Sequence, residues 1–262
     1  MEQKPTVVIK VGGAATADRQ TFTRFLADLN ALRSVSRPIL VHGGGAQVTA
    51  LARTLGIQPV FVDGVRMTGE QEMEVVDMVL CGLINKQIVR GLLAHGAPAV
   101  GISGSDGGLL VGSPITDHEG RPSRTGEVRH CDPRLVETLL DAGYLPVVAS
   151  TFSDGAGGGL NLNADDAALT LATTLRCDTM IFLSDIPGIL ARDGSPIERL
   201  SISGVHGAIG DGTISGGMVV KTRACVHALN NGVKTIIIGR YTEPGALQQL
   251  LAAETGTRIE HD

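Results

Sequence analysis

Val8-Ile9-Lys10-Val11-Gly12-Gly13 and Leu40-Val41-His42-Gly43-Gly44-Gly45 carry the strongest structural signal in this chain. In each stretch an apolar run ends in glycines, and apolar residues at helical spacing follow. Glycine lets backbone N–H groups approach a phosphate closely, and the N-terminus of the next helix adds the positive end of its dipole. One such turn is a weak indication, because ordinary strand–helix connections also use glycine. Two in tandem, with a lysine inside the first strand, favour an α/β protein that binds a phosphate.

Strand and helix patterns alternate along the rest of the chain. Apolar, often β-branched runs predict strands, and apolar residues three or four apart predict helices. The predicted strands are residues 6–11, 38–41, 98–102, 144–149, 179–184 and 234–238, and the predicted helices are 18–32, 47–55, 70–93, 133–141, 165–175, 217–229 and 244–251. This alternation predicts an α/β fold with three αβα layers and a mostly parallel central sheet. Residues 109–128 are expected to form β-hairpins outside that sheet.

Length and composition suit one large α/β domain. The chain has 262 residues, 43% of them hydrophobic but only 3% aromatic, and it contains no Trp. Its core must therefore be built from Ala, Leu, Ile and Val, which suits a sheet covered by helices on both faces. A soft boundary near residues 175–178 divides the single domain, 1–262, into two expected lobes. We expect an N-terminal lobe, 1–176, and a C-terminal lobe, 177–262.

Charge and hydropathy argue against several classes of partner. The net charge is −5 with both signs well mixed, so no basic surface for nucleic acid is expected. No apolar run approaches the roughly 18 residues needed to cross a bilayer, so no membrane association is expected. No signal peptide is recognisable, and the four cysteines are scattered without metal-ligand spacing. These features predict a cytoplasmic protein with reduced cysteines.

The common nucleotide-binding motifs are missing. Residues 210–215 fail the G-x-G-x-x-G pattern at its last position, and residues 212–217 have P-loop spacing but are followed by Met218 and Val219. Lys10 lies within a buried strand pattern, where a charge is costly unless it is paired or functional. Lys221, taken alone, is an ordinary solvated helix residue.

Polar residues before the helix at 165–175 allow two interpretations. Asn163 is a good N-cap for that helix, and Asp165 in its first turn would favour the helix dipole. Alternatively, Asp165 orients lysines or a metal ion. The alternation of the chain places Asn161 and Asn163 on the same side.

Taken together, these motifs resemble the amino-acid kinase (carbamate-kinase-like) superfamily from about residue 6 to residue 260. The residues that carry the resemblance are Lys10-Val11-Gly12-Gly13, His42-Gly43-Gly44-Gly45, Asn163-Ala164-Asp165, residues 183–190 and Gly216-Gly217-Met218-Val219-Val220-Lys221. Within that superfamily the chain is similar to the acetylglutamate kinases in residues 61–68, 75–86, 101–104, 106–108 and 256–259, whereas Ser105 stands where many relatives have Lys. The resemblance implies ATP-dependent phosphorylation of the side-chain carboxylate of N-acetyl-L-glutamate in arginine biosynthesis.

The resemblance also implies a role for each matching position. Lys10 and Lys221 would contact the transferring phosphoryl group, and Asp165 would hold the two lysines. The N-terminal lobe would bind the acyl amino acid and form the dimer interface, and the C-terminal lobe would bind the nucleotide. The implied substrate-binding residues are Gly44, Gly45, Arg66, Asn161 and Asn163, and the implied nucleotide-binding residues are Gly12, Gly13, Ser184, Asp185, Gly188, Gly217 and Met218.

The chemistry of carboxylate phosphorylation agrees with these residues. A side-chain carboxylate with a pKa of about 4.3 is already ionised at neutral pH, so no general base is needed. The reaction needs positioning and charge neutralisation, which lysines, backbone amides and Mg²⁺ supply. We expect Mg²⁺ to arrive as MgATP, with no metal site built from protein side chains. Arg66 suits a carboxylate because its planar fork binds both oxygens.

The sequence leaves two alternative functions open. The alternatives are a carrier-protein-linked aminoadipate kinase of lysine biosynthesis and a non-catalytic sensor of nucleotide or amino acid on the same fold.

Only a few residues precede the first predicted strand, whereas arginine-regulated relatives carry an additional N-terminal helix. The expectation is therefore a homodimer without arginine feedback.

Overall fold

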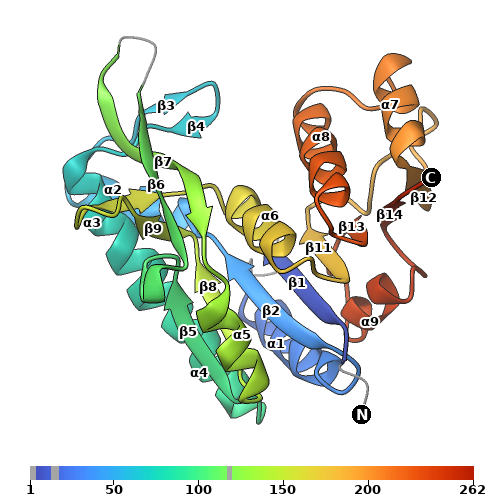
Figure 1. The fold of residues 1–262 in the computed structure, drawn as a ribbon, viewed down its shortest axis with the longest axis horizontal. Helices are drawn as coiled ribbons and strands as arrows, with labels where there is room; N and C mark the ends of the chain where they lie inside the picture. Colours follow the sequence, from blue (N-terminus) through green and yellow to red (C-terminus); the bar gives the residue numbers. More distant parts are fainter. Residues whose placement is uncertain (1–3, 13–17, 117–119) are drawn as a thin grey trace. The chain divides into compact units, whose positions relative to one another are not determined.

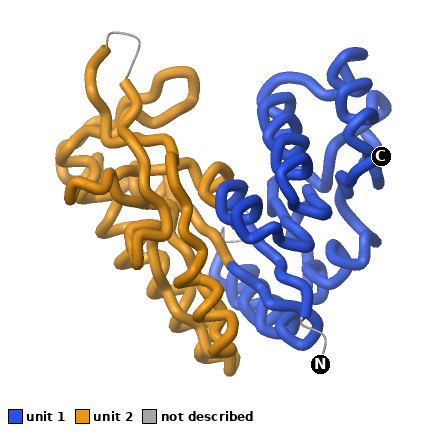
Figure 2. Tube along the Cα trace, in the orientation of Figure 1, with its two compact units in different colours: residues 1–39, 168–262 blue, residues 40–167 orange. Residues whose placement is uncertain are grey.

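The computed structural model describes residues 4–12, 18–116 and 120–262 (Figure 1). Two compact units make up the chain: residues 1–39 with 168–262 form unit 1, and residues 40–167 form unit 2 (Figure 2). The chain leaves unit 1 within strand β2 (Arg37–His42) and returns within helix α6 (Ala164–Thr174). These bounds differ from the predicted lobes, 1–176 and 177–262, because the first strand belongs to the same unit as the C-terminal residues.

Unit 1 is built on a mostly parallel sheet. Its strand order is β12 (Arg199–Ser201), β14 (Thr257–Glu260), β13 (Thr235–Gly239), β11 (Thr179–Leu183) and β1 (Thr6–Val11). Strand β11 pairs in parallel with both β1 and β13, and β13 pairs antiparallel with β14. The strands are nearly continuous apolar runs because both faces are covered, as in other parallel sheets.

The helices of unit 1 are α1 (Arg19–Leu32), α7 (Ile202–Gly210), α8 (Gly217–Asn230) and α9 (Ala246–Leu251), with the second part of α6. Asp18 caps α1, since its carboxylate accepts hydrogen bonds from the backbone N–H groups of Gln20 and Thr21. Helices α8 and α9 pack on β13, and α9 also contacts α1.

Unit 2 contains a second parallel arrangement, in which β8 (Leu145–Ala149) lies between β2 and β5 (Ala99–Ser103). Helices α4 (Asn85–Ala94) and α5 (Arg134–Asp141) both contact β8, and α2 (Gly45–Thr54) follows β2. The predicted helix 70–93 is present, but it contains a π-helical turn. Helix α3 (Glu70–Asp77) continues into the π-helix η2 (Met78–Ile84) and then into α4.

The predicted hairpin region forms a separate small sheet in unit 2. Strand β6 (Leu110–Thr116) pairs antiparallel with β7 (Pro122–Cys131), and β9 (Thr151–Ser153) and β10 (Gly159–Asn161) close the arrangement. A short 3₁₀ turn, η3 (Asp106–Gly108), precedes β6, and β3 (Phe61–Val62) pairs with β4 (Val65–Arg66). The predicted α/β class with a mostly parallel sheet and covering helices is confirmed. Among the described residues, no helix is long and apolar enough to span a membrane.

Candidate active site

Lys10 lies directly against the first glycine turn in unit 1. A Cβ placed on Gly12 would come within 3.3 Å of Lys10 Nζ and 3.7 Å of the Leu183 carbonyl oxygen. The lysine side chain therefore folds back over the glycine, and the ammonium group lies next to the backbone where a side chain would otherwise be. This juxtaposition of an ammonium group and an uncovered peptide suits a phosphate oxygen. Gly13 lies outside the described residues.

Lys221 adjoins the same part of unit 1. It lies in the second turn of α8, and its Nζ lies 5.2 Å from the centre of the Phe182 ring. Phe182 is fully buried in β11, and its Cα is paired with that of Lys10 in β1. Phe182 thus links the two predicted catalytic lysines, through its ring to Lys221 and through its backbone register to Lys10.

The segment that follows β11 is tied to the neighbouring strands. Ser184 donates its backbone N–H to the Gly239 carbonyl at 2.8 Å, and the Thr257 hydroxyl accepts the N–H of Ile189 at 2.7 Å. Asp185 is exposed and Gly188 is buried. Gly217 and Met218 begin α8, four and three residues before Lys221. These predicted nucleotide-binding residues all belong to unit 1, but their contacts with a nucleotide remain a prediction.

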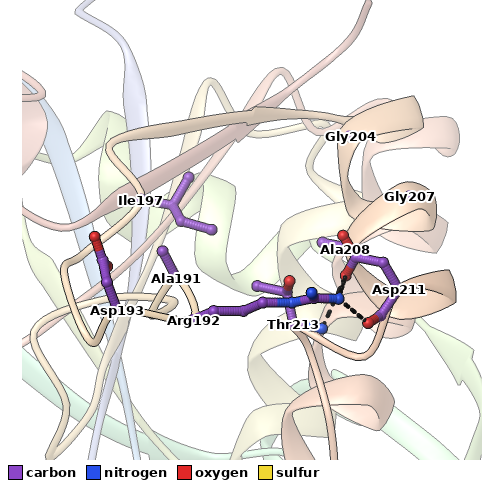
Figure 3. A pocket seen from close by; sticks show the side chains of 9 residues that line it. All are labelled: Ala191, Arg192, Asp193, Ile197, Gly204, Gly207, Ala208, Asp211 and Thr213. Carbon is purple, nitrogen blue, oxygen red and sulfur yellow. Dashed lines mark hydrogen bonds and ion pairs between the residues drawn. The ribbon is translucent and has the colours of Figure 1, made fainter.

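A pocket of about 690 Å³ lies in unit 1, just after this segment in the chain (Figure 3). Arg192 extends along it toward Asp211, with 3.7 Å between Nη2 and Oδ1, and its guanidinium also donates to the Asp211 carbonyl. Ser184, Asp185 and Gly188 are not among its lining residues. The pocket is lined by Ala191, Arg192, Asp193, Ile197, Gly204, Gly207, Ala208, Asp211 and Thr213.

The second glycine turn, in unit 2, leads from β2 into α2. Each of its three carbonyl oxygens accepts a hydrogen bond from within unit 2. The Gly43 oxygen lies 3.0 Å from His42 Nδ1, the Gly44 oxygen accepts from Val48 N at 3.0 Å, and the Gly45 oxygen accepts from Arg66 Nη2 at 3.0 Å. All three carbonyl groups of the turn are therefore hydrogen-bonded within unit 2. The N–H groups at the start of α2 have no acceptor within the helix, as at any helix N-terminus, and can face an anion.

Gly44 is required at its position by close packing. A Cβ there would lie 2.1 Å from Ile84 Cδ1 and 2.8 Å from Leu80 Cδ2, both from η2. A Cβ on Gly43 would lie 3.2 Å from that of Ala164, so the turn also adjoins the start of α6.

Arg66 is held by several partners in unit 2. Nη1 donates to Glu72 Oε1 at 2.5 Å, and Nη2 donates to Thr49 Oγ1 at 2.7 Å as well as to the Gly45 carbonyl. Its Cζ also lies 4.8 Å from the centre of the Phe61 ring. The Arg66 and Glu72 side chains are only 10% and 3% exposed, so the pair is well shielded from water.

These contacts leave Arg66 able to bind a further ligand. They use three of the five N–H groups of the guanidinium, so donors remain for a carboxylate. Because Glu72 balances the charge of Arg66, a carboxylate would be held by directed hydrogen bonds and by the orientation of the guanidinium.

The predicted asparagines lie near the same part of unit 2. Asn161 donates to the Thr68 hydroxyl at 3.0 Å, and Thr68 is in turn bonded to Thr125 through its backbone N–H and its hydroxyl, each at 3.0 Å. Asn163 accepts from the Asp165 N–H at 2.9 Å, which confirms that it caps α6.

The remaining predicted roles can be placed by unit. Asp165 lies in the first turn of α6 in unit 2, whereas Lys10 and Lys221 lie in unit 1. Its role in holding the lysines stays a prediction. Among the residues that the structure describes, no group of three or more His, Cys, Asp or Glu side chains is arranged to hold a metal ion.

Sequence reasoning missed Thr49, Glu72 and Phe182, none of which gives a local signal. Glu72 and Thr49 become site residues only through contacts across 6 and 17 positions of the chain.

Residues 5–240 match the amino acid kinase family. Because this match covers most of the chain, the chain belongs to the amino acid kinase family. Within that family it is similar to curated acetylglutamate kinases. It is 42% identical over 259 residues to the acetylglutamate kinase of Sulfurovum sp. (strain NBC37-1), covering 97% of this chain and 91% of that protein. It is 41% identical to the chloroplastic acetylglutamate kinase of Arabidopsis thaliana, covering 97% of this chain and 75% of that one.

Solved structures share the fold at lower identity. N-acetylglutamate synthase from Neisseria gonorrhoeae, in complex with coenzyme A and N-acetyl-glutamate, superposes with a TM-score of 0.85 at 24% identity, covering 99% of this chain and 60% of that one. Giardia carbamate kinase gives a TM-score of 0.72 at 19% identity over the whole of both chains.

Proposed function

We propose that this protein transfers the γ-phosphoryl group of ATP to the side-chain carboxylate of N-acetyl-L-glutamate, giving N-acetyl-L-glutamyl 5-phosphate and ADP, in arginine biosynthesis. A carboxylate oxygen forms the new bond to the γ-phosphorus, and the bond from that phosphorus to the β–γ bridging oxygen breaks. The observation that carries this proposal is the similarity to curated acetylglutamate kinases over 97% of the chain. The buried, oriented Arg66 supports it, because the acceptor carries a second carboxylate at its α-carbon.

The proposed site residues fall into two groups, one that contacts the phosphoryl group and one that holds the acyl amino acid. Lys10, the amide groups beside Gly12, and Lys221 would neutralise the phosphoryl oxygens, while Arg66 and Asn161 would hold the acyl amino acid. The positive charge of the Lys10 ammonium group beside Gly12 suits the negative charge of a triphosphate. The cation bound to that triphosphate would neutralise the remaining charge. Mg²⁺ brought by ATP would reduce the charge of the phosphates. No protein base is required, since the acceptor is already ionised.

An assay that traps the acyl phosphate with hydroxylamine tests this assignment. ATP is supplied with N-acetylglutamate, glutamate, aspartate or N-acetylated aminoadipate, and hydroxamate and ADP are measured together. N-acetylglutamate should give both products at the highest kcat/KM. Turnover of free glutamate with none of the acetylated form would overturn the acceptor, and a preference for N-acetylated aminoadipate would favour the lysine-pathway alternative. ATP binding without ADP release with any acceptor would instead favour a sensor.

We also infer a cytoplasmic homodimer formed through unit 2. Large apolar side chains are exposed along its long helical segment, at Met78, Leu83 and Leu93, which are 56%, 48% and 53% exposed. A partner subunit would remove such surface from water. Sedimentation equilibrium should give twice the mass of the 27.2 kDa chain, and a monomer at micromolar concentration would contradict the inference.

A further inference from the structure

His42 and Asn85 form a buried polar pair behind the second glycine turn, and the exposed Lys86 joins it through its ammonium group. His42 is 1% exposed at the end of β2, and Asn85 is 1% exposed at the start of α4. Asn85 Nδ2 lies 3.1 Å from His42 Nε2, 3.2 Å from the Ile102 carbonyl oxygen and 2.9 Å from the Val147 carbonyl oxygen. The proposed function assigns no role to this network.

The contacts fix the orientation of the Asn85 amide. Lys86 Nζ donates to Asn85 Oδ1 at 3.0 Å and to the Gly101 carbonyl at 2.9 Å. The opposite orientation would point Oδ1 at two carbonyl oxygens and the NH₂ group at an ammonium group. Nδ2 is therefore the nitrogen, and its N–H groups are shared among the three acceptors.

The orientation of the amide in turn fixes the state of the imidazole. Because Asn85 presents an N–H group to His42 Nε2, that nitrogen must accept. Nδ1 then carries the proton and donates it to the Gly43 carbonyl oxygen at 3.0 Å. Burial is the main cause that lowers the pKa of His42 to about 4, the nearby Lys86 charge lowers it further, and the Gly43 hydrogen bond opposes both. The ring is therefore neutral near pH 7.

The Gly43 carbonyl belongs to the same peptide group as the Gly44 N–H. A trans peptide is planar, so its carbonyl and its N–H point in opposite directions, and the described residues contain no cis peptide bond. Holding the Gly43 oxygen toward His42 therefore turns the Gly44 N–H away from His42. Packing of Ile84 and Leu80 against Gly44 restricts the turn further.

Building on the proposed function, and on the expectation that Gly44 donates its N–H to an anionic ligand, we propose that His42 is a positioning residue. Its Nδ1–H, oriented through Asn85, holds the Gly43–Gly44 peptide so that the Gly44 N–H faces the acceptor or the transferring phosphoryl group. His42 itself neither touches substrate nor moves a proton. The alternative is that His42 is only a satisfied core residue, which would affect stability alone.

Two substitutions separate these roles. In His42→Asn, the amide nitrogen can occupy the place of Nδ1 and keep a donor to Gly43. In His42→Gln, the polar atoms lie one bond further out, near the place of Nε2, so contact with Asn85 is kept and the donor to Gly43 is lost. Both variants should unfold at a lower denaturant concentration than the wild-type protein. If His42 positions the turn, His42→Asn should keep at least about a third of kcat, and His42→Gln should lose about 30-fold or more, in line with the cost of misplacing one catalytic donor. His130→Gln replaces an exposed histidine of β7 in the same unit. It is the control for any general effect of a histidine substitution on folding and activity.

A second measurement does not depend on turnover. Long-range ¹H–¹⁵N spectra at pH 7 should show His42 protonated at Nδ1, and the Gly44 amide resonance should shift more in His42→Gln than in His42→Asn. If wild type shows this tautomer yet does not phosphorylate N-acetylglutamate, the proposed function fails and the positioning of the turn stands. A proton on Nε2, or equal losses of kcat in the two variants, would overturn the inference about His42.

Discussion

The ammonium nitrogen of Lys221 lies 5.2 Å from the centre of the Phe182 ring, and Phe182 is paired with Lys10 in the adjacent strand. A cation above an aromatic face is attracted to it, most strongly where water is excluded. The buried ring thus supports Lys221, and its strand position is in register with Lys10.

Replacing Phe182 by Leu should therefore affect rate more than fold. The variant removes the aromatic face under Lys221, and we expect kcat to fall about tenfold, while the acceptor KM changes less than about twofold. Stability should fall by about 1–2 kcal/mol, as for other reductions of core volume. Phe25→Leu is the matched control, since Phe25 is equally buried but packs on Tyr241. Similar kcat values in the two variants would show that the ring has no part in catalysis.

Gly12→Ala should displace the ammonium group of Lys10. The added Cβ would lie 3.3 Å from Nζ, a tight contact that a flexible side chain relieves by moving. We expect kcat to fall about tenfold with the melting temperature nearly unchanged, because misplacing a charged group weakens transition-state stabilisation. Gly82→Ala, where the new Cβ meets nothing within 4 Å, is the control and should keep the wild-type rate. Full activity in Gly12→Ala would contradict the placement of Lys10.

Arg66→Lys should weaken acceptor binding selectively. A lysine ammonium cannot reproduce the planar fork that bonds Glu72, Thr49 and the Gly45 carbonyl together. The KM for N-acetylglutamate should rise tenfold or more, and that for ATP should stay within about twofold. Steady-state kinetics with each substrate varied in turn measure both values. Arg129→Lys, at an exposed pair with Glu127, should change neither, and an unchanged acceptor KM in Arg66→Lys would remove Arg66 from the site.

His42 should make stability depend on pH. Its folded pKa of about 4 lies below its ordinary value of 6.5, so between these values the unfolded chain binds more protons than the folded one. Stability is therefore lost as pH falls through that window, by about 2 kcal/mol between pH 7 and pH 5. Urea unfolding at both values should show this loss in wild type and a loss smaller by that amount in His42→Asn. Equal losses would mean that burial does not lower the pKa of His42 in the folded protein.

Most of the elements could be predicted from local patterns, and the failures have physical causes. Helix α7 was not predicted, because Gly204, Gly207 and Gly210 interrupt its apolar pattern and glycine is typical of loops. The unit boundaries were also unpredictable. They depend on the pairing of Val7 with Thr179, which joins residues 172 positions apart and leaves no mark on either segment alone.

Some residues of the site could likewise be predicted from the sequence, and others could not. Lys10 stands out because a charged side chain interrupts a buried strand, and the glycine turns stand out because they end apolar runs. Phe182 looks like any core residue, and its relation to Lys221 exists only once α8 lies over β11. Glu72 looks like a solvated helix residue, yet it is 3% exposed because Arg66 reaches it from a different element.

The π-helical turn η2 makes residue count as important as residue identity. It contains one more residue per turn than the α-helices on either side would need. Deleting a single residue from Met78–Ile84 would let the segment wind as a regular α-helix, with α3 and α4 kept in nearly their present orientation because the lost residue and the tighter winding compensate. Asn85 would then stay near His42, but the side chains that η2 places against Gly44 would change. A one-codon deletion here should disturb the packing on the glycine turn without altering any residue in it, whereas substitutions at the exposed Met78 or Leu83 should leave the turn intact.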